Sequence, residues 1–447
     1  MRKKIYILIV LMLSVLYGCS DTTVLDTKTV AENLSDERKA ALGYTEDNLD
    51  YYGENVQAYI ESDGRTCLRV FSAPIEYSNN LIEDVEDEYV ARGSYFPKVF
   101  PKQLSDKTSI KIGDDYDFAE IMPSDGNVYA SEMSETINAF GQKRKAVVYS
   151  DMFGKEGNYR CYATAFGVNA EIVLPKRAEQ NTFRIKLKLP NLVPDTGSPD
   201  YILFKTALEK GQVQSILYTP LAVDKKGKWC YSNTVRLIEK DSSTNTYTVE
   251  YTIDQKFLQD KSTKYPVVLN QSIHLYKPKQ PDTSAYENTG EQAGHYLSPY
   301  MLLGDKTIKG EGWTFVRYET LNSLNIPADK IVSAKYVFHN LFDLEKEAKI
   351  GAYAVTADWC SINTRWFNRP PFDEKPISEV LIKDRGDYEL DITALMKEMI
   401  ANKERENAKY SVQNSFLIRS DSIDSNMIFA SGDNGLFSLV LEIVLSE

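Results

Sequence analysis

The sequence predicts a mainly β protein built from two β-sandwich-type domains. Tyrosine is the commonest aromatic residue, with 29 copies, and aromatic side chains favour strands. Apolar and polar residues alternate over several short segments, which is typical of strands buried on one face. Turn signals such as Asp125–Asn127 and Lys226–Lys228 separate these segments.

The individual strands are predicted from this alternation. In residues 183–189 every second side chain is apolar, and Arg or Lys fills the positions between. Residues 247–253 alternate in the same way between Tyr, Val or Ile and Thr or Glu. Both patterns predict half-buried antiparallel strands. Residues 436–445 are apolar on both faces except at Ser438 and Glu442, which predicts a central strand.

One short helix is expected in the C-terminal half. Counting from Ile392, apolar residues recur at i+3, i+4, i+7 and i+8, on one face of a helix. Asp391 or Thr393 is the expected cap at its start.

The N-terminus has the features of an export signal. Arg2–Lys4 precede an apolar run that ends at Leu16, and Leu16–Cys19 resembles a bacterial lipobox. The resemblance implies a signal peptide over residues 1–18 and a lipid on Cys19. A plain signal peptide and an uncleaved anchor are the alternatives, although the run is shorter than the about 20 residues of a membrane span. We therefore expect a lipid-anchored protein of the cell envelope, outside the cytoplasm, at the cell surface or in the periplasm.

Composition and length predict the domain organisation. The 447 residues are 43% hydrophobic and 26% charged, which is ordinary for a globular chain of two or three domains. The formal net charge of −12 disfavours nucleic acid as a partner. Residues 19–44 are predicted to be the lipidated cysteine and a tether, and Pro and Gly in residues 277–291 predict a linker. The expected domains are a β-rich body over residues 45–276 and a module over residues 282–447.

Beyond Cys19, the remaining cysteines are widely spaced. Cys67, Cys161, Cys230 and Cys360 include no C-x-x-C pair, so a structural zinc site is not expected. An exported chain could pair them in three ways, and free thiols are the favoured interpretation.

Several segments of the C-terminal module occur in the order and spacing of a known family. They are Trp313–Glu319, Asn325–Pro327, Ile331–Phe338, Ala354–Trp359, Trp366–Pro371, Tyr388–Thr393 and Ile428–Ser431. On these segments the module resembles the DNRLRE domain family, from which it departs at Glu319 and Arg365. The resemblance implies a jelly-roll-like β-sandwich. Several relatives are carbohydrate-binding modules for acidic polysaccharides such as alginate, and others belong to wall-associated proteins with YD (Rhs) repeats.

The body carries a second resemblance. Its segments are residues 146–153, 159–162, 167–174, 182–185 and 265–269. In this order they are similar to the β-rich region that precedes DNRLRE domains in YD-repeat wall-associated proteins, although the YD repeats themselves are missing from this sequence.

The sequence nominates no catalytic machinery. His274, His295 and His339 are the only histidines, and no H-E-x-x-H, G-x-S-x-G or phosphate-binding glycine loop is present. His339 lies in an expected strand and is interpreted as a satisfied core or edge residue. We therefore expect a protein that is not an enzyme, with a glycosidase-type carboxylate pair as the remaining alternative.

The module contains candidate carbohydrate-binding residues. The apolar face of a sugar stacks on an exposed ring, and a guanidinium pairs with a sugar carboxylate through two hydrogen bonds. The candidates are Trp313, Trp359, Trp366, Arg317, Arg365 and Arg369. Trp313 follows the Gly310–Gly312 segment and is the ring expected to be exposed, whereas Trp359 and Trp366 match structural positions of the family and are expected in the core.

No cofactor is expected, and calcium is the one ion for which candidate ligands exist. They are Asp114, Asp115 and Asp117 in one loop, and Asp421, Asp424 and Asn426 in another. Neither loop has EF-hand spacing, and hydrophilic turns are the alternative.

These observations leave two functions open. The first is a non-catalytic surface lipoprotein whose C-terminal module binds polysaccharide, acidic polysaccharides included. The second is a structural or interaction protein, related to YD-repeat wall-associated proteins, that binds the cell wall or a protein partner. Exposed rings and basic residues on one face would favour the first, and a flat apolar patch the second.

Overall fold

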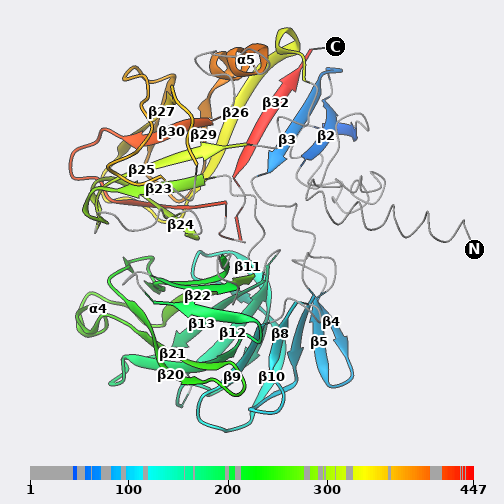
Figure 1. Ribbon diagram of the computed structural model, residues 1–447, viewed down its shortest axis with the longest axis vertical. Helices are drawn as coiled ribbons and strands as arrows, with labels where there is room; N and C mark the ends of the chain where they lie inside the picture. Colours follow the sequence, from blue (N-terminus) through cyan, green and yellow to red (C-terminus); the bar gives the residue numbers. More distant parts are fainter. Residues whose placement is uncertain are drawn as a thin grey trace, which may run out of the picture.

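The structure is a computed structural model of the whole chain (Figure 1). It describes residues 44–47, 56–61, 63–71, 82–91, 97–113, 119–155, 157–164, 167–196, 201–206, 213–275, 282–289, 295, 298–307, 309–318, 326–360, 364–402, 415–432, 434, 436–437 and 439–446. The expected signal peptide, Cys19 and tether lie outside the described residues, except for Tyr44, as do Asp114, Asp115 and Asp117.

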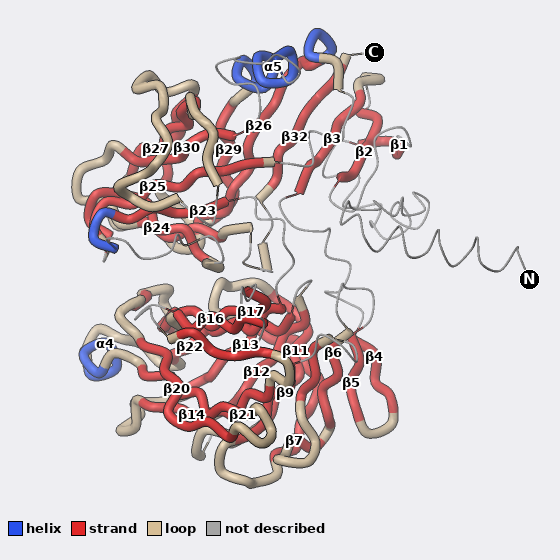
Figure 2. Tube along the Cα trace, in the orientation of Figure 1, coloured by secondary structure: helices blue, strands red, loops and turns tan. Residues whose placement is uncertain are grey.

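The chain forms two β-rich lobes, which confirms the mainly β, two-sandwich fold class (Figures 1 and 2). Figure 2 shows strands throughout both lobes and only short helical segments at their margins. The helical elements of the described residues are α4 (Gln255–Gln259), η2 (Glu287–Thr289), η4 (Ala328–Lys330) and α5 (Thr393–Asn402).

The lower lobe in Figure 1, here called the body lobe, covers residues 82–275 and contains two sheets. The 8-stranded sheet has the order β20 (Thr234–Asp241), β21 (Thr246–Thr252), β14 (Thr182–Lys188), β9 (Ala119–Pro123), β8 (Ile110–Ile112), β6 (Lys98–Pro101), β5 (Glu88–Ala91) and β4 (Ile82–Val85). The 11-stranded sheet has the order β15 (Leu192–Asp195), β16 (Tyr201–Thr206), β17 (Val213–Tyr218), β22 (Val267–Leu275), β13 (Gly167–Leu174), β12 (Asn158–Ala163), β11 (Lys143–Tyr149), β10 (Tyr129–Ile137) and β7 (Gln103–Leu104). Beside this path, β18 (Leu221–Asp224) pairs with β22, and β19 (Trp229–Cys230) pairs with β18.

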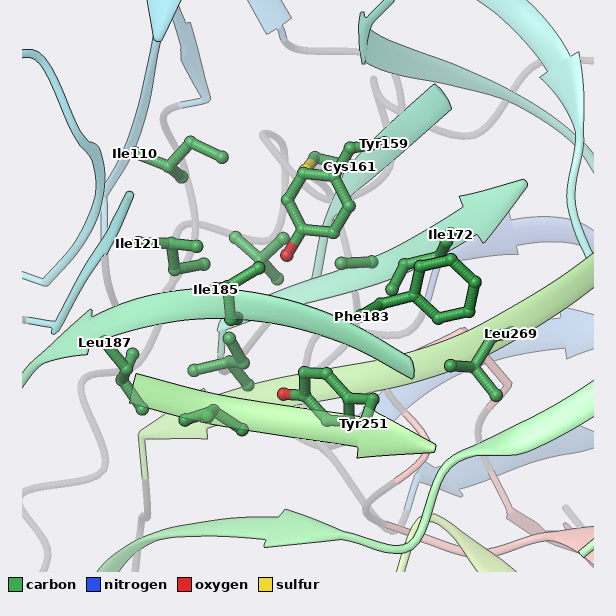
Figure 3. Close-up of a cluster of buried hydrophobic side chains, with 14 of the residues drawn as sticks. Ile110, Ile121, Tyr159, Cys161, Ile172, Phe183, Ile185, Leu187, Tyr251 and Leu269 are labelled. Carbon is green, nitrogen blue, oxygen red and sulfur yellow. The ribbon is translucent and has the colours of Figure 1, made fainter. Parts of the chain in front are cut away.

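The two sheets of the body lobe enclose one apolar core, part of which is drawn in Figure 3. Ile185 and Leu187 of β14 are fully buried there, together with Tyr251 of β21 and Ile172 of β13. The polar residues of β14 lie on its outer face, where Arg184 pairs with Glu250 and Lys188 with Glu120. The alternation of residues 183–189 and 247–253 therefore predicted both strands and their buried faces correctly.

The upper lobe, here called the module lobe, is one 13-stranded sheet folded over a second core. Its order is β1 (Tyr44–Asp47), β2 (Val56–Glu61), β3 (Thr66–Phe71), β32 (Val440–Leu445), β26 (Ile331–Asn340), β31 (Met427–Ala430), β24 (Tyr300–Thr307), β25 (Gly310–Arg317), β30 (Ser415–Ser420), β27 (Ala348–Ala354) and β28 (Ser378–Ile382). Beside this path, β23 (Asp282–Tyr286) pairs with β25, and β29 (Gly386–Asp391) pairs with β26.

Strand β24 forms the corner between the two layers of the module lobe. Its first half pairs with β31 and its second half with β25, and the register shifts after Gly304. Gly304 has a φ of +122°, and a Cβ there would lie 2.4 Å from the Ser425 carbonyl oxygen. Only glycine combines this backbone angle with so close an approach, so the residue allows the strand to pass from one layer to the other.

The division between the lobes differs from the one expected from the sequence. Strands β1, β2 and β3, which were assigned to the body, belong to the sheet of the module lobe, where β3 pairs with β32 from Thr66↔Leu445 to Phe71↔Val440. Strand β23 lies within the segment expected to be a linker. The body lobe is therefore inserted between β3 and β23 of a discontinuous module lobe.

A third apolar layer joins the lobes. In β11, Val147 and Tyr149 point into the body core, while Ala146 and Val148 contact the module lobe. In strand β24, alternate residues likewise belong to the module core and to the layer between the lobes. The joining layer contains Phe140, Ala146, Val148, Tyr162, Leu221, Val223 and Tyr231 of the body lobe and Tyr286, Tyr300, Leu302, Leu341, Phe342, Ile428, Ala430 and Leu436 of the module lobe. Strands β11 and β24 carry apolar residues on both faces because each of them lies between two apolar layers.

Hydrogen bonds cross the same interface. The Tyr300 hydroxyl donates to Asn270 Oδ1 at 2.6 Å, and Arg385 donates to the Phe140 carbonyl at 2.9 Å. Beside them Glu171, fully buried, pairs with Arg160 at 2.8 Å. Burial raises the pKa of Glu171, and the positive charge of Arg160 opposes that rise.

The predicted helix is α5. Leu395, Met396 and Met399 are buried in the module core, and Asp391 Oδ1 accepts the N–H of Thr393 at 2.9 Å. Within the part of the chain that the structure describes, no helix combines the length and apolarity needed to cross a bilayer.

Candidate functional site

The candidate site lies on the outer face of β25, β30 and β27 in the module lobe. In these strands Val316, Phe416 and Ile418 point into the module core. The alternate residues point outward and form a separate aromatic cluster, to which the segment between β27 and β28 adds further rings. That cluster contains Ala285, Trp313, Phe315, Tyr353, Val355, Trp359 and Leu417, with Trp366 and Phe372 packed against it.

Two arginines pack onto the rings at one end of this cluster. The guanidinium carbon of Arg369 lies 4.5 Å from the ring centre of Trp313 and 4.2 Å from that of Trp366. Arg419 lies 5.0 Å from the Trp313 ring centre and 5.4 Å from that of Tyr353. Guanidinium groups at these separations are attracted by the ring quadrupole. We call Trp313, Tyr353, Trp366, Arg369, Phe372 and Arg419 the tryptophan–arginine cluster.

The carboxylates of Asp421 and Glu311 hold residues of this cluster in place. Asp421 accepts hydrogen bonds from the Tyr353 hydroxyl at 2.7 Å and from Arg419, and Glu311 accepts the indole N–H of Trp313 at 2.7 Å. Burial alone would raise the pKa of Asp421, but the Tyr353 hydrogen bond and the Arg419 charge lower it. The carboxylate therefore stays ionised and fixes both partners.

Arg369 differs from Arg419 in its partners. It donates to the Trp366 carbonyl, and among the described residues no carboxylate forms an ion pair with it. Burial lowers the pKa of Arg369, the nearby Glu311 carboxylate opposes that shift, and the Arg419 charge adds to it. A guanidinium nevertheless remains charged in proteins. The remaining N–H groups of Arg369 have no acceptor among the described residues, so they can bind an acceptor from a ligand.

Tyr353 depends on a glycine beside it. A Cβ on Gly351 would lie 2.8 Å from Tyr353 Cε2 and 3.0 Å from its hydroxyl oxygen. The ring thus lies across Gly351, which places its hydroxyl on Asp421.

Five of the six candidate residues form two groups, and Arg365 belongs to neither. Trp313, Trp366 and Arg369 belong to the tryptophan–arginine cluster. Arg317 and Trp359 form the second group, with the guanidinium 5.7 Å from the Trp359 ring centre. Burial lowers the pKa of Arg317. The backbone N–H of Arg365 donates to Asn368 Oδ1 at 2.7 Å, within the turn that presents Trp366.

The expected exposure of Trp313 is wrong. Its side chain is 6% exposed because Trp366, Phe372 and both arginines cover it. Trp359, at 7% exposed, is buried as expected, and Trp366 is half-buried against Trp313. Instead, the exposed ring is Phe367, at 65%.

Sequence reasoning missed Phe367, Tyr353, Phe372 and Arg419. Phe367 adjoins Trp366, and a run of aromatic residues in a turn is a signal that could have nominated it. Arg419 alternates with the buried Phe416 and Ile418 along β30, which marks it as outward-facing. Nothing in the local sequence places Arg419 beside Trp313, because that contact depends on the pairing of β25 with β30.

The other candidate groups are engaged elsewhere. Among the described residues, no three His, Cys, Asp or Glu side chains gather as a metal site would require. Asp421 is used by Tyr353 and Arg419, and the Asp424 N–H donates to Asp305. His339 contacts Asp387 at 2.7 Å and stacks on Phe437. Cys67, Cys161, Cys230 and Cys360 form no disulfide with one another.

Comparisons with known proteins assign no family to the chain. No family model and no curated protein matches it. A solved structure of exo-β-1,3-galactanase from Phanerochaete chrysosporium with galactose covers 85% of this chain and 93% of its own. It is 9% identical and has a TM-score of 0.14, which is too low for an argument about fold or activity.

Proposed function

We propose that this protein is a non-catalytic lipoprotein of the cell envelope whose module lobe binds polysaccharide at the tryptophan–arginine cluster. The observation that carries the proposal is Arg369, held against Trp313 and Trp366 without a carboxylate partner among the described residues. A guanidinium positioned in this way presents a fork of donors that matches a carboxylate.

The surface around Arg369 suits a sugar chain. Phe367 exposes 65% of its surface beside the half-buried Trp366, so two adjacent rings offer apolar faces for sugar C–H groups. The proposed contacts are therefore Trp366, Phe367 and Arg369. Trp313 packs against both Trp366 and Arg369 and so supports them. Because Arg369 pairs best with a carboxylate, acidic polysaccharides are the preferred ligand class.

The position of the N-terminal strands is compatible with display of this site outward. Strand β1 lies at one end of the 13-stranded sheet, and β27 and β28 lie at the other. In Figure 2, β1 and β27 are on opposite sides of the module lobe. If the chain is lipidated at Cys19, as the resemblance to a lipobox implies, the attachment reaches the lobe at β1. The tryptophan–arginine cluster then lies on the far side of the lobe from the attachment.

Affinity gel electrophoresis of the full chain tests the proposal against neutral and acidic polysaccharides. We expect retardation by an acidic polysaccharide, weakened about tenfold by Trp366→Ala or Phe367→Ala, as at a binding hot spot. The matched control is Ile137→Ala, because Ile137 is also 65% exposed but lies in the body lobe. Arg369→Lys keeps the positive charge but loses the paired N–H donors of the guanidinium. It should therefore weaken the binding of acidic polysaccharides more than that of neutral ones.

Two results would overturn the assignment. Retardation that survives Trp366→Ala and Phe367→Ala would place the polysaccharide site elsewhere in the chain. If no polysaccharide retards the native protein, the binding proposal fails, and isolation of partners from cell-wall fractions tests the alternative of a structural or interaction protein related to YD-repeat wall-associated proteins.

A further inference from the structure

A second candidate site lies in the body lobe, at the end of the sandwich. A hollow of about 370 Å³ opens between the turn after β9, the turn between β11 and β12, and the start of β14. Small-molecule sites span about 300–1,000 Å³, so this hollow accepts a small ligand. We call it the end pocket. It is lined by Pro123–Asp125, Met152–Gly154, Gln180 and Thr182–Arg184.

The floor of the end pocket consists of packed apolar side chains. Phe153 packs edge-to-face on Phe183 and Tyr159, with ring centres 5.7 and 5.6 Å away, and Met152 is buried beside it. The turn that carries Phe153 is closed by its N–H, which donates to the Gly157 carbonyl at 3.0 Å. A wall that is ordered before binding lowers the entropy lost by binding.

The rim supplies both acceptors and donors. Asp125 accepts bonds from Asn127 and Tyr129, and these bonds lower its pKa although burial alone would raise it. Its carboxylate oxygens have further lone pairs. Arg184 donates through Nε and one terminal nitrogen to Glu250, at 2.9 and 2.8 Å, and its other N–H groups have no acceptor among the described residues.

The charges of the rim disfavour an anionic ligand, because Asp125 stays ionised beside the Arg184–Glu250 pair. Glu250 already neutralises Arg184, so the guanidinium offers hydrogen bonds rather than net charge to a ligand. Asp125 offers acceptors that match hydroxyl groups. An apolar ring below, with a carboxylate and a guanidinium at the rim, suits a compact molecule with one apolar face and several hydroxyls.

From this arrangement we infer that the end pocket binds a single sugar unit or a short neutral oligosaccharide, with its apolar face on Phe153 and its hydroxyls on Asp125 and Arg184. This inference does not rest on the proposed function of the module lobe. The two sites lie in different lobes and share no residue, so each can fail alone.

Saturation-transfer NMR of the full chain tests the inference with methyl glycosides of glucose, galactose, mannose and N-acetylglucosamine. We expect transfer to at least one glycoside, with affinity lowered about tenfold by Asp125→Ala, because the variant loses its hydrogen bonds to the ligand's hydroxyl groups. Gln180→Trp, which fills the mouth of the pocket, should abolish the signal.

Asp241→Ala is the matched control. Asp241 also caps a surface turn, through Ser243 and Thr244, and its pKa is also lowered, but it lies outside the end pocket. Its replacement should leave glycoside binding unchanged. The inference is overturned if no glycoside binds, if binding survives both pocket variants, if Asp241→Ala weakens binding as much as Asp125→Ala, or if alanine, used as a zwitterionic probe, binds and the glycosides do not.

Discussion

Trp313 shows how neighbours decide the role of a single side chain. Its position after Gly310–Gly312 indicates an accessible ring, yet two guanidinium groups and two further rings cover it. Those groups come from β30 and from the segment between β27 and β28. A Trp313→Ala variant would therefore disturb the support of the cluster as well as any ligand contact, which is why Trp366 and Phe367 are the better probes.

Asp282 provides a prediction at the residue scale. Its side chain is 1% exposed, and its carboxylate accepts the Gly432 N–H at 2.7 Å. Burial raises the pKa of Asp282 to about 7 from an ordinary value of 3.8. Between these pH values the native state holds a proton that the unfolded chain has released, so stability falls as pH rises and levels off above pH 7.

The variant Asp282→Asn should remove this contribution. We expect denaturant midpoints of the native protein to fall between pH 4 and 7 more steeply than those of Asp282→Asn. Asp260→Asn serves as the contrast, because the hydrogen bond from Lys228 lowers the pKa of Asp260. Asp260 therefore changes the pH dependence of stability only at more acidic pH. Parallel pH profiles for Asp282→Asn and the native protein would contradict the assignment.

At the scale of elements, β3 links the start of the described chain to its end. Its residues pair with β32, and Leu68 and Val70 are fully buried in the module core. A module cut out as residues 282–447 would lack these strands and leave an edge of β32 unpaired. Such an edge is prone to pair with other chains.

Leu68→Ala measures the contribution of β3 to the module lobe. Leu68 is 0% exposed, and removing a buried leucine side chain costs about 2–5 kcal/mol of unfolding free energy. The control is Leu381→Ala on β28, where the leucine is 56% exposed and the change should stay within about 0.5 kcal/mol. Equal, small effects of the two replacements in chemical denaturation would contradict the pairing of β3 with the module lobe.

At the scale of the whole molecule, the joining layer makes the two sandwiches one packed body. Phe140 of the body lobe is 1% exposed, and its ring contacts Tyr300, Phe342 and Phe437 of the module lobe. The chain also crosses twice between the lobes, because the body lobe is inserted after β3. Both features favour cooperative unfolding.

Calorimetry tests this cooperativity. We expect a single transition for the native protein, and two separated transitions for Phe140→Ala, because the large-to-small change weakens only the layer between the lobes. Phe204→Ala is the control, since Phe204 is buried inside the body core and its loss should lower the melting temperature without separating the lobes. Two transitions in the native protein would show that the lobes unfold independently.

The sequence by itself determined the local elements of this protein. The alternation around Ile185 and Tyr251 predicted β14 and β21 with their buried faces, and the spacing from Ile392 predicted α5 with Asp391 or Thr393 as its cap. In the structure Asp391 Oδ1 accepts the Thr393 N–H. These patterns repeat with the period of the strand or helix, so neighbours in the sequence carry the whole signal.

Only the tertiary structure decided which surfaces meet. The pairing of β3 with β32, the apolar layer between the lobes and the contact of Arg419 with Trp313 all join residues far apart in the sequence. Apolar periodicity shows that a face is buried but not what buries it, so it could not assign β1–β3 to the module lobe. The glycines before Trp313 likewise carry no information about the distant side chains that cover its ring. Long-range strand pairing supplies that information, because it alone sets which side chains stand opposite one another.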